Sequence, residues 1–265
     1  MKKTIGFIGC GNMGAALARA VRKTVDGADL LLADLDVGKC EALAKELDAK
    51  VSSAEEIAET AFCIVLGVKP QGLEKTLAPL KAILADRKDP FFFVSMAAGT
   101  PIDRIAAYAG ASYPTVRIMP NLPAAIGEGM ILYTLKNTCP TCEQFFLSAF
   151  AKAGMLDEIP EGMMDAAAAL SGCGPAFVAL FAEALADGAV ACGVPREKAQ
   201  LYAEKTILGT AKYLLETGMH PAVLKDAVCS PGGTTIAGVE ALENGSFRAA
   251  TASAVTSAFE KTKKL

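Results

Sequence analysis

Three glycines near the start of the chain have the spacing of a phosphate-binding turn. They belong to the run Gly9-Cys10-Gly11-Asn12-Met13-Gly14. Gly9 permits a sharp turn, Gly11 lets the backbone approach a pyrophosphate, and Gly14 lets a helix pack closely on the preceding strand. The N–H groups at the start of that helix would face the phosphates. A glycine triplet also occurs in turns that bind nothing, so its neighbours decide the interpretation.

The neighbouring elements are those of a dinucleotide-binding unit. Residues 4–8 predict a strand, residues 15–21 a helix with an apolar stripe, and residues 30–33 a second strand that ends at Asp34. A carboxylate at that strand end can accept hydrogen bonds from the ribose hydroxyls of NAD, and it would repel a 2′-phosphate. We therefore expect NADH or NADPH as cofactor, with NADH preferred. The alternative is that Asp34 caps the helix that follows.

The first 160 residues alternate between strand and helix signals. Further strands are expected near residue 51 and at 62–68, 91–95, 115–119, 130–134 and 155–159, and helices at 37–47, 54–59, 73–84 and 142–151. This alternation predicts a doubly wound parallel sheet, the Rossmann arrangement, in which ligands lie beyond the carboxyl ends of the strands. The residues expected beside the glycine turn for this reason are Val68, Lys69, Pro70, Ala97 and Ala98. Asn121 lies between Pro120 and Pro123 in a loop after the strand at 115–119, and it is expected to be a fixed polar group of the cofactor site. For the small residues the alternative is ordinary packing at a strand end.

The chain changes character after Pro160. Helices are expected at 163–170, 175–190, 196–217 and 240–264, the last broken near Gly245. This part is rich in alanine and apolar residues, so we expect it to be under-stabilised as an isolated bundle of helices. We therefore expect residues 1–160 to form the nucleotide-binding domain, and residues 161–265 to form an all-α domain buried against a second subunit.

A second glycine-rich loop interrupts this helical part. Its residues are Ser230, Pro231, Gly232, Gly233, Thr234 and Thr235. The glycines free the backbone, the hydroxyl side chains supply hydrogen bonds, and a helix starting here would point N–H groups at an anion. The loop suits a small carboxylate; the alternative is an elaborate helix cap. Another break, at 171–175, places two glycines and a proline where a bend or a close approach is needed.

Other chemistry has little support. The single histidine, His220, lies at a turn before Pro221, so no Ser/His/Asp triad is available and a His-containing metal cluster is not expected. Cys139 and Cys142 have C-x-x-C spacing without a second pair, which favours a turn at a helix start over a zinc site.

Composition excludes several classes of partner. The chain has 265 residues, of which 52% are hydrophobic and 21% charged, with 26 basic against 29 acidic residues. That balance gives no reason to expect nucleic acid or an anionic membrane as partner, and aromatic residues are only 6%. The continuous apolar runs are shorter than a bilayer span, and the start does not fit a signal peptide. We expect a cytoplasmic protein.

The chain resembles pyrroline-5-carboxylate reductase, the last enzyme of proline synthesis, over nearly its whole length. The resemblance rests on the glycine turn, on 68–70, 117–121 and 171–176, and above all on the run 224–235. It implies a Rossmann domain followed by a helical dimerisation domain, and dimers that assemble further into decamers. The reaction implied is hydride transfer from NAD(P)H to C5 of the cyclic imine, giving L-proline.

The resemblance also implies roles for particular residues. Ser230 and the backbone N–H groups of the second loop would hold the substrate carboxylate, the Thr235 hydroxyl would face the ring nitrogen and act in catalysis, and Glu161 would lie near the ligand. Asp34 departs from many relatives, in which small hydroxyl residues tolerate a 2′-phosphate, so their usual NADPH preference does not carry over directly.

Two alternatives stay open at this stage. One is another small Rossmann-plus-helix oxidoreductase, a hydroxyacid dehydrogenase or an imine reductase. Such dehydrogenases need a lysine as acid, and Lys198, Lys205 and Lys212 lie on a predicted helix without an associated motif. The other is a nucleotide-sensing protein that catalyses no reaction. The loop at 230–235 argues against it, because a sensor needs no second anion site.

Overall fold

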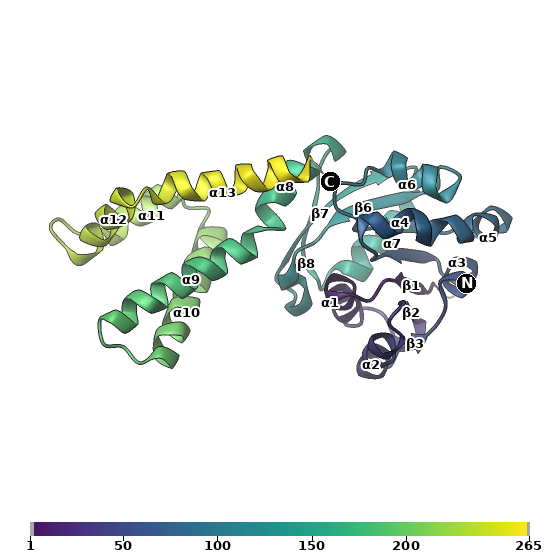
Figure 1. The fold of residues 1–265 in the computed structure, drawn as a ribbon, viewed down its shortest axis with the longest axis horizontal. Helices are drawn as coiled ribbons and strands as arrows, with labels where there is room; N and C mark the ends of the chain where they lie inside the picture. The colour runs from purple at the N-terminus through teal and green to yellow at the C-terminus, as the bar shows by residue number, and fades with distance from the viewer. Residues whose placement is uncertain (1–2, 264–265) are drawn as a thin grey trace. The chain divides into compact units, whose positions relative to one another are not determined.

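A computed structural model describes residues 3–263 of the chain. By compactness the described residues divide into two units, one of residues 3–173 with 259–263 and one of residues 174–258. The first unit carries the sheet, and the second consists of helices (Figure 1). The division falls in the break at 171–175, where one helix ends at Ser171 and the next begins at Gly174.

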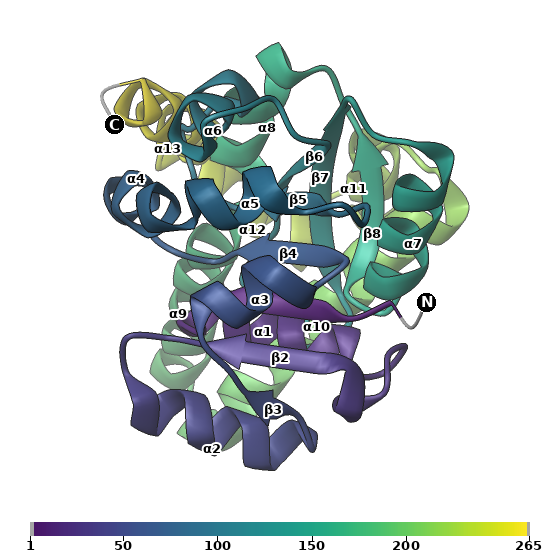
Figure 2. The same cartoon turned by 90° about the vertical axis from the view of Figure 1, so that its right-hand side faces the viewer.

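The first unit is built on one eight-stranded sheet with the order β3-β2-β1-β4-β5-β6-β7-β8 (Figure 2). The strands are β1 (Ile5–Ile8), β2 (Leu30–Ala33), β3 (Lys50–Val51), β4 (Cys63–Leu66), β5 (Phe92–Ser95), β6 (Thr115–Met119), β7 (Gly129–Lys136) and β8 (Gly154–Glu158). The first six run parallel to one another. In β1, β2, β4 and β5 every residue is buried, as expected for strands covered on both faces.

Helices cover both faces of this sheet. They are α1 (Asn12–Val21), α2 (Val37–Leu47), α3 (Ala54–Thr60), α4 (Pro70–Leu77), α5 (Lys81–Asp86), α6 (Ile102–Ala109), α7 (Pro140–Phe150) and α8 (Met164–Ser171). One core includes Leu17, Leu43 and Phe146, from α1, α2 and α7. The opposite core is formed with α3, α4, α5 and α6, and includes Ile57 and Leu73. The doubly wound fold is thereby confirmed.

Two features of the sheet unit differ from the expectation. Strand β7 is antiparallel to β6, and β8 pairs in parallel with β7, so the sheet is not parallel throughout. The connection from β6 to β7 spans only residues 120–128, whereas a parallel crossover needs a dozen or more residues. Helix α6 was not expected either. It buries Ile102, Ile105 and Ala109 at helical spacing, and Gly110 ends it in the left-handed conformation.

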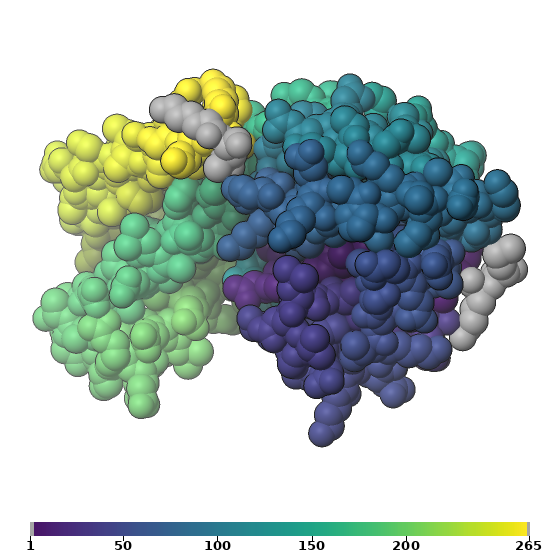
Figure 3. Space-filling view, turned by 45° about the vertical axis from the view of Figure 1, so that its right-hand side comes forward, coloured from purple at the N-terminus to yellow at the C-terminus, as the bar shows by residue number. Residues whose placement is uncertain are grey.

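The helical unit contains α9 (Gly174–Ala191), α10 (Arg196–Thr217), α11 (Pro221–Val228) and α12 (Thr234–Asn244), and α13 (Phe247–Thr262) begins in it. Its buried core is small and consists of Ala186, Ala199 and Ala203. Large apolar side chains lie on its surface instead, among them Leu180, Leu201, Leu208 and Leu215, of which Leu215 is 83% exposed. Leu180 lies on α9 and the other three on α10, two helices whose residues are drawn in green in Figure 3. A surface of this kind is typical of a protein interface.

One helical run reaches membrane length. The run Glu161–Ala191 has 31 residues and a mean hydropathy of 1.5 in its most apolar window, of which 6% is buried within the chain. This run is not one continuous apolar stretch, because the break at 171–175 separates its two helices. Length and composition alone are weak evidence for a membrane span.

Candidate active site

The turn between β1 and α1 has the geometry that its glycines predict. Gly9 has a φ of +104°, and its N–H donates to the carbonyl of Ala33 over 2.8 Å. A Cβ on Gly14 would lie 2.2 Å from the carbonyl oxygen of Gly9, so only glycine allows α1 to pack this closely. A Cβ on Gly11 would meet nothing within 4 Å. Gly11 therefore leaves open space at the start of the helix.

The first turn of α1 offers free hydrogen-bond donors. The helix begins at Asn12, followed by Met13, and its N-cap Gly11 supplies no side chain to pair with the N–H groups. Unpaired N–H groups at a helix start attract anions, and phosphate is the common ligand of this arrangement. Beside the turn lies a hollow of about 550 Å³ lined by Cys10, Gly11 and Asn12 and by residues of α1 and α2. The residues present fit a dinucleotide.

Asp34 lies directly against this turn. One carboxylate oxygen accepts the N–H of Cys10 over 2.6 Å, and the other accepts the N–H of Asp36 over 2.9 Å. The cap of α2 is Asp36, which accepts the N–H of Lys39 and pairs with its ammonium group over 2.9 Å. The alternative that Asp34 caps this helix is therefore wrong. Asp34 instead joins the end of β2 to the glycine turn.

The Cys10 thiol is unreactive although it lies in the glycine turn. Burial raises the pKa of its thiol to about 12, with further contributions from Cys40 and from the negative charge of Asp34. The thiol remains protonated at neutral pH. Cys10 therefore contributes its backbone N–H to this site rather than a nucleophile.

The residues that follow β4 and β5 lie at the same edge of the sheet as the glycine turn. Ile8, Leu66 and Ser95 are paired in register across β1, β4 and β5. Val68 and Lys69 follow β4, and Pro70 opens α4; Ala97 and Ala98 follow β5. A Cβ on Gly67 would lie 2.4 Å from the Gly9 carbonyl oxygen, which shows how closely these strand ends approach each other. Ala97 is buried and Ala98 is partly exposed.

Asn121 follows β6 and is held by two hydrogen bonds. Its side-chain N–H donates to the carbonyl of Ser171 over 2.9 Å, and its oxygen accepts the N–H of Met130 over 3.0 Å. The amide therefore ties the loop after β6 to β7 and to the end of α8. This is the fixed polar group that the flanking prolines indicate.

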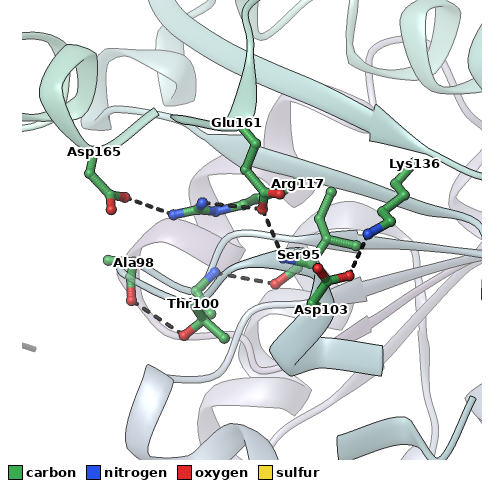
Figure 4. A network of polar contacts seen from close by, with 10 residues as sticks. Ser95, Ala98, Thr100, Asp103, Arg117, Lys136, Glu161 and Asp165 are labelled. Atoms are coloured by element: carbon green, nitrogen blue, oxygen red, sulfur yellow. Dashed lines mark hydrogen bonds and ion pairs between the residues drawn. The ribbon is translucent and has the colours of Figure 1, made fainter. Parts of the chain in front are cut away.

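Glu161 lies in a charged network around Arg117 (Figure 4). Arg117 is only 2% exposed, and its guanidinium donates to Glu161 over 3.3 Å and to Asp165 over 2.8 Å. Glu161 also accepts the N–H of Ile102, at the start of α6, over 2.8 Å. The structure thus gives Glu161 a role in the sheet unit that its sequence position did not predict.

Arg117 itself was not predicted to have a role. Its Nε is buried without a partner within residues 3–263. The available signal was a charged residue inside an otherwise apolar strand, because a buried guanidinium must be paired. Its two partners lie four residues apart, the spacing that places side chains on one face of a helix.

The second glycine loop precedes α12 in the helical unit. Gly232 has a φ of +68°, and the N–H of Gly233 donates to the carbonyl of Ser230 over 3.0 Å. Gly233 is the N-cap of α12 and gives it no side-chain partner; the helix begins with Thr234 and Thr235. A Cβ on Gly233 would lie 2.3 Å from the Ser230 hydroxyl, so a larger residue there would displace that hydroxyl from its present position.

This second loop can bind an anion. Within residues 3–263, no hydrogen bond engages the hydroxyls of Ser230, Thr234 and Thr235. Three hydroxyls and the free N–H groups of a helix start form a donor set for a carboxylate. Among the residues described, no group of three or more His, Cys, Asp or Glu side chains could hold a metal ion.

Fold and site together define a class of protein: an NAD(P)-binding oxidoreductase with a Rossmann-type domain and a helical domain. Residues 161–265 match the family model "Pyrroline-5-carboxylate reductase dimerisation", and residues 4–99 match the model "NADP oxidoreductase coenzyme F420-dependent". The pyrroline-5-carboxylate reductase of Escherichia coli is 40% identical over 273 residues, covering 100% of this chain and 99% of that protein. That of Arabidopsis thaliana is 39% identical, covering 98% and 95%.

A solved structure agrees over the same length. The Plasmodium falciparum pyrroline carboxylate reductase with NADP bound has a TM-score of 0.87 and 32% identity, and covers 99% of this chain and 98% of that one. The chain belongs to the pyrroline-5-carboxylate reductase family.

Proposed function

We propose that this chain reduces 1-pyrroline-5-carboxylate to L-proline with NADH or NADPH. The observation that carries the proposal is the second glycine loop, an uncapped helix start with hydroxyls suited to the substrate carboxylate, in a chain whose other part carries a dinucleotide fingerprint. Full-length similarity to the enzyme from E. coli supports the same reaction. The bound cofactor supplies a hydride, which adds to C5 of the protonated imine and gives the ring amine.

The cofactor site of the proposal is the carboxyl edge of the sheet. The turn formed by Gly9, Cys10, Gly11, Asn12, Met13 and Gly14 holds the pyrophosphate through backbone N–H groups. Val68, Lys69, Pro70, Ala97 and Ala98 surround the nicotinamide. Asn121 holds the loop after β6 in place. The Asp34 carboxylate accepts hydrogen bonds from the ribose hydroxyls, and its negative charge repels a 2′-phosphate. NADH is therefore the preferred cofactor.

The substrate site of the proposal is the loop before α12. Ser230 and the N–H groups of Gly233, Thr234 and Thr235 bind the carboxylate, and Gly232 provides the required backbone turn. The Thr235 hydroxyl faces the ring nitrogen and is the catalytic group. Glu161 is assigned to the substrate from the resemblance alone, and the assigned domains stay those expected from the sequence, residues 1–160 for the nucleotide and residues 161–265 for dimerisation and the substrate.

The proposed chemistry needs little acid–base help from the protein. A protonated imine is already electrophilic, and orienting two reactants can contribute about 7–11 kcal/mol to catalysis. His220 caps α11, where its ring nitrogen accepts the N–H of Ala222 over 3.2 Å. The chain therefore contributes to catalysis mainly by binding and orienting the imine and the cofactor.

The exposed apolar helices of the second unit fit subunit contact. The match of residues 161–265 to a dimerisation family supports a homodimer whose interface covers this surface, including the apolar run 161–191. Dimers that assemble into a decamer, as the resemblance implies, belong to the same proposal. All eight cysteines are free thiols, which is typical of a reducing compartment and supports a cytoplasmic location.

An assay of cofactor oxidation tests the proposal. The purified protein, given NADH and 1-pyrroline-5-carboxylate, should oxidise the cofactor and form proline. Thr235→Val should lower kcat, and Ser230→Ala should mainly raise KM for the imine, each by about 10–100-fold, because each removes a hydrogen bond to a charged group. Thr60→Val, at the exposed end of α3, is the matched control and should match the wild type. Unchanged kinetics in both loop variants would remove this loop from the site.

A further inference from the structure

Two cysteines at the start of α7 form a close pair that the proposed reaction does not use. Cys139 is the N-cap of the helix and is exposed, whereas Cys142 in its first turn is 2% exposed. Their sulfur atoms lie 2.9 Å apart. Because a disulfide joins sulfurs about 2.05 Å apart, a displacement of less than about 1 Å would bond them.

The two thiols have opposite environments. The N–H of Cys142 donates to the Cys139 sulfur over 3.3 Å, and the helix start adds its positive field. The hydrogen bond from the Cys142 thiol and those from backbone N–H groups lower the pKa of the Cys139 thiol. Burial raises the pKa of Cys142 to about 11. An exposed thiol that ionises more readily than the buried thiol beside it is the arrangement of an attacking and a resolving cysteine.

Other charged and titratable groups of the described residues lie near the pair. Glu143 lies in the same helical turn. Lys3 lies with its ammonium group 5.4 Å from the ring of Phe145 on α7, and its charge lowers the pKa of Cys142. Cys63 on β4 is fully buried; burial raises the pKa of its thiol, and the nearby Cys142 adds to this. Cys63 is therefore a poor alternative to Cys139 as the disulfide partner of Cys142.

We propose that Cys139 and Cys142 form a reversible dithiol–disulfide site that reacts with low-molecular-weight disulfides. The Cys139 thiolate attacks one sulfur of the disulfide R–S–S–R and releases one R–S⁻, which takes up the proton lost by Cys139. The Cys142 sulfur, after losing its proton, attacks Cys139 and releases the second R–S⁻, which takes up that proton. Two protein thiols are oxidised to one disulfide, and R–S–S–R is reduced to two R–SH.

The site lies away from the proposed cofactor site. Strand β7 runs antiparallel to β6 and ends at Lys136, which is paired with Thr115 at the start of β6. The pair of cysteines follows β7 and therefore lies at the amino edge of the parallel strands, whereas the glycine turn lies at their carboxyl edge. Oxidation of the two cysteines can accordingly be measured separately from the reductase activity at the cofactor site.

Mass spectrometry of the whole protein in glutathione buffers tests this proposal. Glutathione disulfide should lower the mass of the segment 137–152 by about 2 Da without leaving glutathione attached to this pair, whereas the exposed thiols of Cys173 and Cys192 can each take up glutathione. Trypsin cleavage after Lys136 and Lys152 should release residues 137–152, which contain these two cysteines and no other, as one internally bonded peptide. Reduced glutathione in excess should restore both thiols.

Serine variants assign the two roles. Cys142→Ser should trap one glutathione on residue 139, whereas Cys139→Ser should leave Cys142 unmodified because it is buried. Serine is a good N-cap, so the second variant keeps its helix. Cys192→Ser, which removes another exposed thiol, should behave as the wild type in the 137–152 peptide. The proposal is overturned if the wild type keeps glutathione on Cys139, if Cys142 bonds to Cys63, or if both thiols stay reduced.

Discussion

The carboxylate of Asp34 accepts a hydrogen bond of 2.6 Å from the backbone N–H of Cys10, inside the glycine turn. Its other oxygen accepts the N–H of Asp36, so each oxygen accepts a hydrogen bond from a backbone N–H. An acid at this position is expected to select the cofactor, and here it also fixes the shape of the turn. A test of selectivity must therefore remove the charge and keep the hydrogen bond.

Asp34→Asn makes that separation. The amide oxygen can still accept the Cys10 N–H, while the negative charge that opposes a 2′-phosphate is lost together with the weaker contact to the Asp36 N–H, which the amide NH2 group cannot accept. We expect the ratio of kcat/KM with NADPH to kcat/KM with NADH to rise about tenfold, the scale of one charge–charge interaction near a protein surface. Steady-state kinetics with both cofactors measure it. Glu59→Gln on α3 is the charge-matched control. An unchanged ratio would mean that Asp34 serves only the turn.

Two alanine substitutions in the glycine turn should have different effects. Gly14→Ala places a Cβ against the carbonyl of Gly9 and should lower the free energy of unfolding by more than about 2 kcal/mol. Gly11→Ala meets nothing in the protein, so stability should hold while the Kd for the cofactor rises about tenfold or more. Thermal unfolding and cofactor titration separate the two effects. If Gly11→Ala binds the cofactor normally, the pyrophosphate does not approach this turn.

Glu161 and Asp165 are a matched pair for a test at Arg117. Glu161→Gln and Asp165→Asn each remove one negative charge from a buried guanidinium, and each should lower the free energy of unfolding by about 1–3 kcal/mol. Only Glu161→Gln should also raise KM for the imine, because Glu161 alone is assigned to the substrate site. Denaturant unfolding and kinetics on both variants give the comparison. Equal KM values in the two variants would leave Glu161 as a structural residue.

Asp89 should contribute stability that depends on pH. The guanidinium of Arg87, which also bonds the carbonyls of Ala58 and Ala61, lowers the pKa of the Asp89 carboxyl. A carboxyl whose pKa is lower in the folded state stabilises the protein above its unfolded pKa of about 3.9, and this contribution is lost as the pH falls through the folded value. The stability difference between wild type and Asp89→Asn should therefore be largest near neutral pH and shrink below about pH 4. A constant difference across that range would show that Asp89 does not titrate in this way.

Much of the fold follows from local patterns. The helix expected at 196–217 has those bounds, and the strand–turn–helix around Gly9 is present as expected. These elements were predictable because apolar periodicity, prolines and glycines act within a few residues. The direction of β7 was harder to predict. The connection at 120–128 is too short for a parallel crossover, but its length is known only once the ends of β6 and β7 are known.

The polar contacts of the site were less predictable than its backbone. The choice between Asp34 and Asp36 as the helix cap depends on which backbone N–H each carboxylate reaches. The partners of Arg117 lie 44 and 48 residues away along the chain, so no local pattern could identify them. The residues proposed to bind the substrate stay predictions, and the variants above test them.

The order of strands in the sheet also bears on aggregation. Its two edges are β3 and β8, and unpaired edges invite strands from other molecules. Strand β3 has only two residues, one of them Lys50, and β8 ends in the exposed pair Asp157 and Glu158. A very short edge at one side and two negative charges at the other oppose edge-to-edge pairing. The chain can therefore expose apolar helices for subunit contact while the edges of its sheet resist strand pairing with other molecules.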